Sequence, residues 1–212
     1  MLSKYGRRLV AEPLAKLVAW LHGIGVTPNM LTYTGFVFTA VSAVLLARGS
    51  FVWGGAVLLL AAFFDMLDGS LARATDQSST FGAFIDSTLD RYSESITFLA
   101  LAYHYMWTPG SRTELVLIFV ILIGSLMVSY TRARAEGLNI ECKAGILQRP
   151  ERVLLLVFGL LIGGMLPILW ILAIFTNITA IQRIYEVYWR TSHAAANVKP
   201  QKIASPGDNP LL

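Results

Sequence analysis

Apolar residues along this chain gather into stretches of about 20 residues, the length that an α-helix needs to cross the hydrocarbon core of a bilayer. Six such stretches are present, at residues 31–47, 51–71, 83–106, 114–133, 153–170 and 168–187. Only Gly163, Gly164 and Pro167 interrupt the apolar run from Val153 to Ile181, so the boundary between the last two is the least defined. The pattern predicts an all-α integral membrane protein with six transmembrane helices.

Residues 1–25 have a different, amphipathic pattern. Apolar side chains recur on one helical face, at Leu9, Leu14, Leu17, Val18 and Leu21. Basic residues that include Lys4, Arg7 and Lys16 are available for the opposite face. This pattern is typical of a helix that lies on the membrane surface and not of a signal peptide.

The composition agrees with a membrane protein. Apolar residues make up 55% of the 212-residue chain and charged residues only 14%, and the mean hydropathy is +0.60. These values exclude intrinsic disorder of the whole chain and weigh against a water-soluble domain. The single cysteine, Cys142, excludes a disulfide framework and a cysteine-based zinc site. A net charge of +4 in so apolar a chain indicates a basic membrane face and not nucleic-acid binding.

The basic residues also predict an orientation. Six spans place both termini on one side, and the loops on the other side contain only Arg48 and Arg112 of the 17 Lys and Arg residues. The positive-inside rule therefore predicts a cell-membrane protein with cytoplasmic termini. Residues 1–191 would form one membrane domain, and the polar, proline-containing residues 192–212 a disordered cytoplasmic tail.

Acidic residues lie inside the second and third apolar runs, where a carboxylate is costly. They are Asp65, Asp68, Asp86, Asp90 and Glu94. Asp65 and Asp68 are about 60° apart around a helix, and the spacing of Gly82, Asp86 and Asp90 by fours draws them along one stripe. The short turn at residues 74–80 makes the two helices antiparallel, so the end of the first should lie beside the start of the second.

Four converging carboxylates repel one another unless cations neutralise them. Oxygen ligands without His or Cys favour a hard cation, and Mg²⁺ or Mn²⁺ held partly by substrate phosphates fits best. Two other interpretations are buried salt bridges to Arg73 and Arg91, and an ion or proton pathway through a transporter. Two arginines cannot neutralise the whole set, which favours the metal site.

The segment from Asp65 to Asp90 reads DMLDGSLARATDQSSTFGAFIDSTLD, which fits the pattern DxxDGxxARx8GxxxDxxxD at every specified position. This pattern resembles the signature of the CDP-alcohol phosphatidyltransferases. Residues 27–32, which include Thr27, Asn29 and Thr32, also resemble the start of that family's first span. The resemblance implies a six-span enzyme, commonly a homodimer, that transfers a substituted phosphate from a CDP-linked lipid to an alcohol and releases CMP.

The resemblance also implies roles for individual residues. Asp65, Asp68 and Asp86 would be metal ligands for Mg²⁺ or Mn²⁺, with two ions expected. Asp90 would be the general base and a further metal contact. The CDP-lipid site would consist of Asn29, Thr32, Asp65, Asp68, Gly69, Ala72, Arg73, Thr80 and Gly82.

A second cluster of charge bears on the acceptor alcohol. Arg132 and Arg134, then Arg149 and Arg152, lie at the predicted cytoplasmic ends of the fourth and fifth spans. They could anchor the helices at the interface or bind a phosphate on the acceptor. We expect Arg132, Arg134 and Arg152 to bind that phosphate.

The pattern around these arginines is similar to the phosphatidylinositol phosphate synthase branch of the family, whose acceptor is inositol 1-phosphate. Arg132 departs from that branch, because lysine is expected at its position. The products would be phosphatidylinositol phosphate and CMP. A glycerol 3-phosphate acceptor is the alternative, as in phosphatidylglycerophosphate synthases.

Overall fold

The computed structural model describes residues 4–75 and 79–197, and all secondary structure within them is α-helical. The seven helices are α1 (Lys4–Gly23), α2 (Pro28–Ala47), α3 (Phe51–Thr75), α4 (Thr80–Met106), α5 (Arg112–Glu136), α6 (Arg149–Ile162) and α7 (Met165–Asn197). The predicted all-α class is confirmed.

Local capping explains where the helices next to the acidic residues begin. Thr27 caps α2 by accepting a hydrogen bond from the Met30 amide, and Pro28 occupies the first helical position, where its missing N–H costs nothing. Ser79 caps α4 by accepting a 2.9 Å hydrogen bond from the Gly82 amide. Both caps start their helices three residues before the apolar stretches predicted at 31 and 83.

The predicted boundary between the last two apolar stretches is wrong. Helix α6 ends at Ile162, because Gly163 adopts a left-handed backbone with φ of 80°. Helix α7 begins at Met165, and Pro167 lies in its first turn, where proline is tolerated. The break therefore lies at Gly163 and Gly164, and Pro167 does not end a helix.

Four of the helices are long and apolar enough to cross a membrane, namely α2, α3, α5 and α7. Helix α4 has sufficient length, but Asp86, Asp90, Arg91 and Glu94 lower its hydropathy. Helix α6 has 14 residues and spans about 21 Å at 1.5 Å per residue, less than the hydrocarbon thickness. Thus the protein is a helical membrane protein with four candidate spans.

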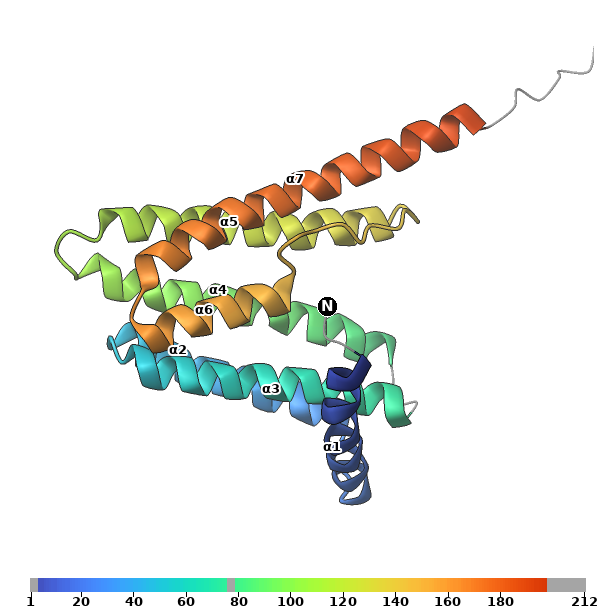
Figure 1. Ribbon diagram of the computed structural model, residues 1–212, viewed down its shortest axis with the longest axis horizontal. Helices are drawn as coiled ribbons and strands as arrows, with labels where there is room; N and C mark the ends of the chain where they lie inside the picture. Colours follow the sequence, from blue (N-terminus) through green and yellow to red (C-terminus); the bar gives the residue numbers. More distant parts are fainter. Residues whose placement is uncertain (1–3, 76–78, 198–212) are drawn as a thin grey trace, which may run out of the picture.

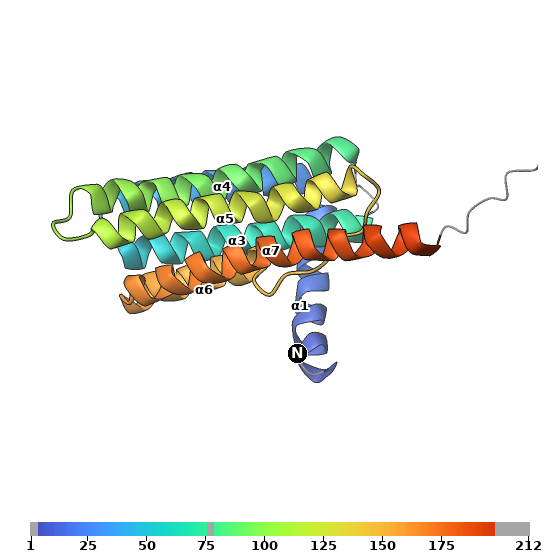
Figure 2. The same ribbon diagram turned by 90° about the horizontal axis from the view of Figure 1, so that it is seen from above.

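Helices α2 to α7 run alongside one another, whereas α1 crosses their direction at one end (Figures 1 and 2). Packing contacts connect them in a ring: α2 packs on α3 and α4, α5 on α4 and α7, and α6 on α3 and α7. Within the described residues no Cα atoms of α3 and α4 lie within 8 Å of each other, although only four residues separate the two helices in the sequence. Side chains must therefore reach across the interior to bring their acidic residues together.

The interior and the outer surface of the bundle are both apolar. Leu101, Ile118, Leu160 and Leu172 belong to one large buried cluster. Large apolar side chains also point outward along most of the helices, for example Val37, Leu99, Ile123 and Ile174. An outer surface of this kind fits a lipid environment.

The predicted disordered tail and the predicted turn after residue 74 are only partly covered by the described residues. Helix α7 continues to Asn197 and extends beyond the other helices (Figure 1), so residues 192–197 are helical and not disordered as expected. The rest of the predicted tail, residues 198–212, lies outside the described residues. Residues 76–78 of the predicted turn also lie outside them.

Candidate active site

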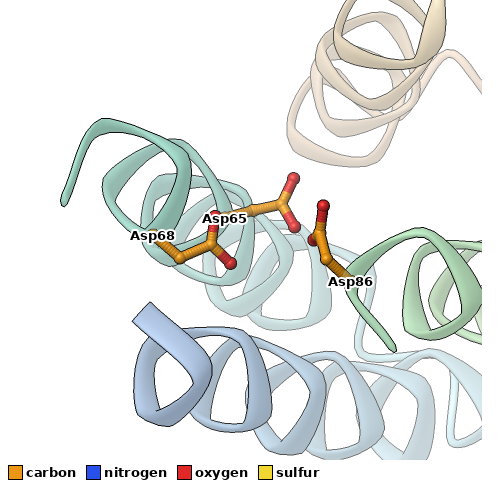
Figure 3. Close-up of side chains that lie close together, drawn as sticks. All are labelled: Asp65, Asp68 and Asp86. Carbon is orange, nitrogen blue, oxygen red and sulfur yellow. The ribbon is translucent and has the colours of Figure 1, made fainter. Parts of the chain in front are cut away.

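Three carboxylates converge between the end of α3 and the first turns of α4. One oxygen each from Asp65, Asp68 and Asp86 can be chosen so that all three lie within 4.8 Å of one another. Figure 3 shows the two α3 side chains and the α4 side chain directed at the space between these helices. Carboxylate oxygens are the ligands that a hard divalent cation prefers, so this arrangement fits a metal site.

Helix α2 fixes the orientation of one of these ligands. The Thr32 hydroxyl donates a 2.7 Å hydrogen bond to Oδ2 of Asp68, and both side chains are buried. Thr32 lies one turn after the start of α2, so the Thr27 cap and Pro28 determine its position. Thr32, predicted from the sequence to line the CDP-lipid site, thus contacts the acidic cluster directly.

Asp90 lies one turn after Asp86 and has a different partner. Its Oδ1 atom lies 2.7 Å from Nη1 of Arg149, and the same Nη1 lies 2.5 Å from Oδ2 of Asp65. Arg91 is a more distant partner at 3.5 Å from Asp90. The first residue of α6 therefore links the acidic residues of α3 and α4.

Glu94 and Arg152 form a second, more deeply buried ion pair next to the first. Nε and Nη2 of Arg152 donate to the two carboxylate oxygens of Glu94 at 2.8 and 2.9 Å. The Arg152 side chain is only 3% exposed and the Glu94 side chain 10%. Glu94 therefore holds Arg152 through two hydrogen bonds.

The residues of both ion pairs line a cavity of about 790 Å³ enclosed by α2, α3, α4 and α6. Its polar part contains Asp65, Asp90, Glu94, Arg149 and Arg152. Further along α3 and α6 the lining becomes apolar, with Leu58, Leu60, Phe63, Leu154 and Leu156. A cavity that is charged at one end and apolar beyond it suits an amphipathic ligand.

Small residues keep the space beside the carboxylates open. A Cβ atom at Gly69 would lie 3.2 Å from Nη1 of Arg73, and both residues line the cavity. A Cβ atom at Gly82 would lie 3.1 Å from Oδ1 of Asn29. Gly82 thus lets the start of α4 come close to the start of α2.

Other predicted site residues lie outside the cavity lining. Thr80 is exposed at the start of α4, and Ala72 is half-buried on α3. Arg132 and Arg134 are exposed near the end of α5, where Arg132 pairs with Glu136 at 2.8 Å. Of the three arginines predicted to bind the acceptor phosphate, only Arg152 lines the cavity.

Two features of the site were not predicted from the sequence. Arg149 was noted only as part of an arginine cluster, yet it is the cation closest to the acidic residues. Helix α7 also carries polar residues at Thr179, Gln182, Arg183 and Glu186 inside a predicted span. Their spacing of three, four and seven residues places them on one helical face and could have indicated a packed polar surface.

Comparisons with known proteins agree with this geometry. Residues 25–184 match the family model of the CDP-alcohol phosphatidyltransferases. The archaetidylinositol phosphate synthase of Pyrococcus horikoshii is 38% identical over 187 residues, which cover 88% of this chain and 96% of that protein. The phosphatidylinositol phosphate synthase of Mycobacteroides abscessus is 32% identical over 212 residues, covering 96% and 94%.

Solved structures of the phosphatidylinositol phosphate synthase of Mycobacterium tuberculosis have the same fold at 28% identity. The crystal structure with CDP-diacylglycerol bound superposes with a TM-score of 0.76 and covers 82% of this chain and 93% of that one. The structure in complex with manganese and citrate has a TM-score of 0.77 and covers 82% and 88%. This chain is a member of the CDP-alcohol phosphatidyltransferase family, a family of metal-dependent transferases.

Proposed function

We propose that this protein transfers a phosphatidyl group from CDP-diacylglycerol, or a related CDP-lipid, to inositol 1-phosphate. The products are phosphatidylinositol phosphate and CMP. The observation that carries the proposal is the convergence of Asp65, Asp68 and Asp86 beside a cavity that is charged at one end and apolar beyond it. The relatives named for this reaction at 32–38% identity support the choice of acceptor.

The donor lies with its nucleotide at the polar end of the cavity and its acyl chains along the apolar lining. Asn29, Thr32, Asp65, Asp68, Gly69, Ala72, Arg73, Thr80 and Gly82 form the CDP-lipid site. Gly69 supports this proposal, because a larger residue there would push against the Arg73 guanidinium. Arginine is suited to bind the diphosphate through paired N–H donors.

Mg²⁺ is the proposed cofactor, with two ions held by Asp65, Asp68, Asp86 and Asp90, and Mn²⁺ as a substitute. The bound ions offset the negative charge of the diphosphate. Thr32 holds the Asp68 carboxylate in place through the 2.7 Å hydrogen bond. Arg149 orients Asp90, which lies one helical turn beyond Asp86.

Asp90 acts as the general base. It accepts the proton of the acceptor hydroxyl, and the resulting oxygen attacks the phosphorus that carries the lipid. A new bond forms between that oxygen and the phosphorus, while the bond from this phosphorus to the oxygen of CMP breaks. The displaced CMP keeps the bond electrons, and the proton remains on Asp90 until it passes to solvent.

Arg132, Arg134 and Arg152 bind the phosphate of the acceptor. Arg152 supports this assignment most directly, because it lines the cavity and its Nη1 group does not bond Glu94. Glycerol 3-phosphate would carry the same phosphate, and transport of ions or protons would use the same acidic residues. Release of CMP would distinguish an enzyme from a transporter. The acceptor that supports this release would distinguish transfer to inositol 1-phosphate from transfer to glycerol 3-phosphate.

In the membrane, α2 to α7 form six spans and α1 lies in the interface. The crossed orientation of α1 and the apolar outer surface of the bundle support this arrangement (Figure 2). The distribution of basic residues supports an orientation in which the acidic cluster and both termini face the cytoplasmic side of the cell membrane. Residues 1–191 act as one membrane domain, which we expect to form a homodimer.

The test is CMP release by purified protein supplied with CDP-diacylglycerol and Mg²⁺. Inositol 1-phosphate should give the highest rate in a panel with inositol, glycerol 3-phosphate and serine, and Asp90→Asn should abolish the rate. Arg134→Ala and Arg152→Ala should raise the KM for inositol 1-phosphate and leave binding of cytidine nucleotides nearly intact. Ion flux in liposomes without CMP release from any acceptor would refute the enzyme assignment.

A further inference from the structure

A polar face of α7 holds the segment that connects α5 to α6. Residues 141–148 of this segment are called the strap below. Thr179, Gln182, Arg183 and Glu186 all hydrogen-bond its backbone. Four side chains at this spacing share one face of a helix, so a single surface of α7 holds almost the whole strap.

The acceptors on α7 are matched to successive N–H groups of the strap. Oε2 of Glu186 accepts from the amides of Lys143 and Ala144 at 3.0 and 2.8 Å. Oε1 of Gln182 accepts from Ile146 at 3.2 Å. The hydroxyl of Thr179, which is fully buried, accepts from Leu147 at 3.1 Å.

Gly145 allows this close approach. It has a φ of 145°, which L-residues with a side chain rarely adopt, and a Cβ atom there would lie 2.7 Å from Cγ2 of Thr179. In the opposite direction, Arg183 donates from Nε to the Ala144 carbonyl at 2.9 Å. The backbone conformation at residue 145 and the absence of a side chain there therefore both allow the strap to pack directly on α7.

The strap leads directly into the active site. It ends at Gln148, next to the first residue of α6, Arg149, which bridges Asp65 and Asp90. The Leu147 carbonyl accepts from Nη1 of Arg152 at 3.4 Å, and Glu94 engages the other two nitrogens of that guanidinium. The position of the strap thus sets the environment of Nη1, the one Arg152 nitrogen that does not bond Glu94.

The turn at the other end of the bundle is built differently. The α4–α5 turn bonds through its own backbone and its neighbouring helix residues, as with Thr108 and Ser111. The α4–α5 turn is therefore held without a polar helix face. Of these two connections, the strap is the one bonded to a helix face, and it is the one that leads to the arginines of the cavity.

We propose that Thr179, Gln182 and Glu186 are positioning residues that act through the strap to place Arg149 and Arg152 for the phosphorylated acceptor. This inference rests on the proposed function, because it assigns the acceptor phosphate to Arg152. The residues assigned to the CDP-lipid site lie on α2, α3 and α4, whereas the strap leads into α6. Loosening the strap should therefore weaken acceptor binding selectively.

Thr179→Val tests this proposal, because it removes one hydroxyl at nearly constant volume. We expect the KM for inositol 1-phosphate to rise about fivefold, the effect of one lost hydrogen bond, with the KM for CDP-diacylglycerol unchanged. Thr179→Ser keeps the hydroxyl and should behave as the unmodified protein. Thr191→Val is the matched control, since the exposed Thr191 hydroxyl bonds only within α7.

The single cysteine provides a second measurement that does not require activity. Cys142 lies in the strap with 2% exposure, its thiol contacts the Arg183 carbonyl, and burial raises the pKa of the thiol. Maleimide should therefore label the unmodified protein slowly, because the thiolate is the reactive form. Thr179→Val should increase the labelling rate several-fold, while Thr191→Val should leave it unchanged.

Equal rises in both KM values, or an unchanged KM for inositol 1-phosphate with faster labelling, would overturn the proposal. If Thr179→Val does not fold, Gln182→Met removes another acceptor and is judged by the same criteria. Failure of the unmodified protein to use inositol 1-phosphate refutes the proposed acceptor, and the positioning role for that acceptor with it. An active protein with insensitive variants refutes the positioning role alone.

Discussion

Removing the carboxylate of Glu94 would leave the Arg152 guanidinium without its main partner in the interior of the bundle. Arg152 is 3% exposed, and two of its nitrogens donate to Glu94 at 2.8 and 2.9 Å. Its other hydrogen bond, to the Leu147 carbonyl, is longer at 3.4 Å. Glu94→Leu therefore leaves a nearly buried charge with only the longer bond to the Leu147 carbonyl.

Loss of one partner from a buried ion pair destabilises a protein by about 3–5 kcal/mol, most of which is the cost of the unpaired charge. We expect Glu94→Leu to fall in this range. Glu94→Gln keeps one oxygen acceptor and should cost about 1–2 kcal/mol. The double variant Glu94→Leu/Arg152→Met removes both charges and should recover most of the loss, since apolar replacements of such pairs are often neutral.

The free energy of unfolding can be measured in mixed micelles by denaturant titration with tryptophan fluorescence. Arg132→Ala is the control, because the Arg132–Glu136 pair is exposed and should contribute about 0.5 kcal/mol or less. A loss below about 1 kcal/mol for Glu94→Leu would contradict the reasoning. So would a double variant that is as unstable as Glu94→Leu.

Three further predictions concern the metal site, Arg149 and the packing of α2 on α3. EDTA should abolish CMP release, and added Mg²⁺ should restore it. Asp86→Asn should weaken Mn²⁺ binding in an EPR titration. An unchanged affinity for Mn²⁺ would argue against Asp86 as a ligand. Arg149→Met should lower kcat about tenfold or more, because it removes the charge that orients Asp90, and a change confined to KM would contradict that role. Gly54→Ala should destabilise the protein by about 1–3 kcal/mol, because the new Cβ atom would lie 2.5 Å from Cδ2 of Leu46. Gly164→Ala is the control and should be nearly neutral in the same unfolding assay, because a Cβ atom there meets nothing within 4 Å.

The acidic site could be predicted from the sequence because its parts are local. Asp65 and Asp68 are less than one turn apart, and only four residues separate α3 from α4, so that Asp86 comes to face them. Carboxylates are also conspicuous in apolar segments, where they require a compensating cation. The metal-ligand pattern therefore needed no knowledge of how the other helices pack.

The arginines could not be assigned in the same way. Arg149 contacts Asp65 across 84 positions of sequence, and Arg152 contacts Glu94 across 58. Positive charge at the cytoplasmic end of a span is expected whether or not it faces a site. The sequence consequently grouped Arg152 with Arg132 and Arg134, although only Arg152 lines the cavity.

Sequence alone determined the helical class, the approximate limits of α2 to α5 and the acidic residues of the site, because each depends on hydropathy and spacing over a few turns. Tertiary structure decided that α3 and α4 approach only through their side chains, that Arg149 bridges Asp65 and Asp90, and that α7 holds the strap. Hydropathy reports whether a position is buried but not which partner it meets. That choice depends on the packing of helices far apart in the chain.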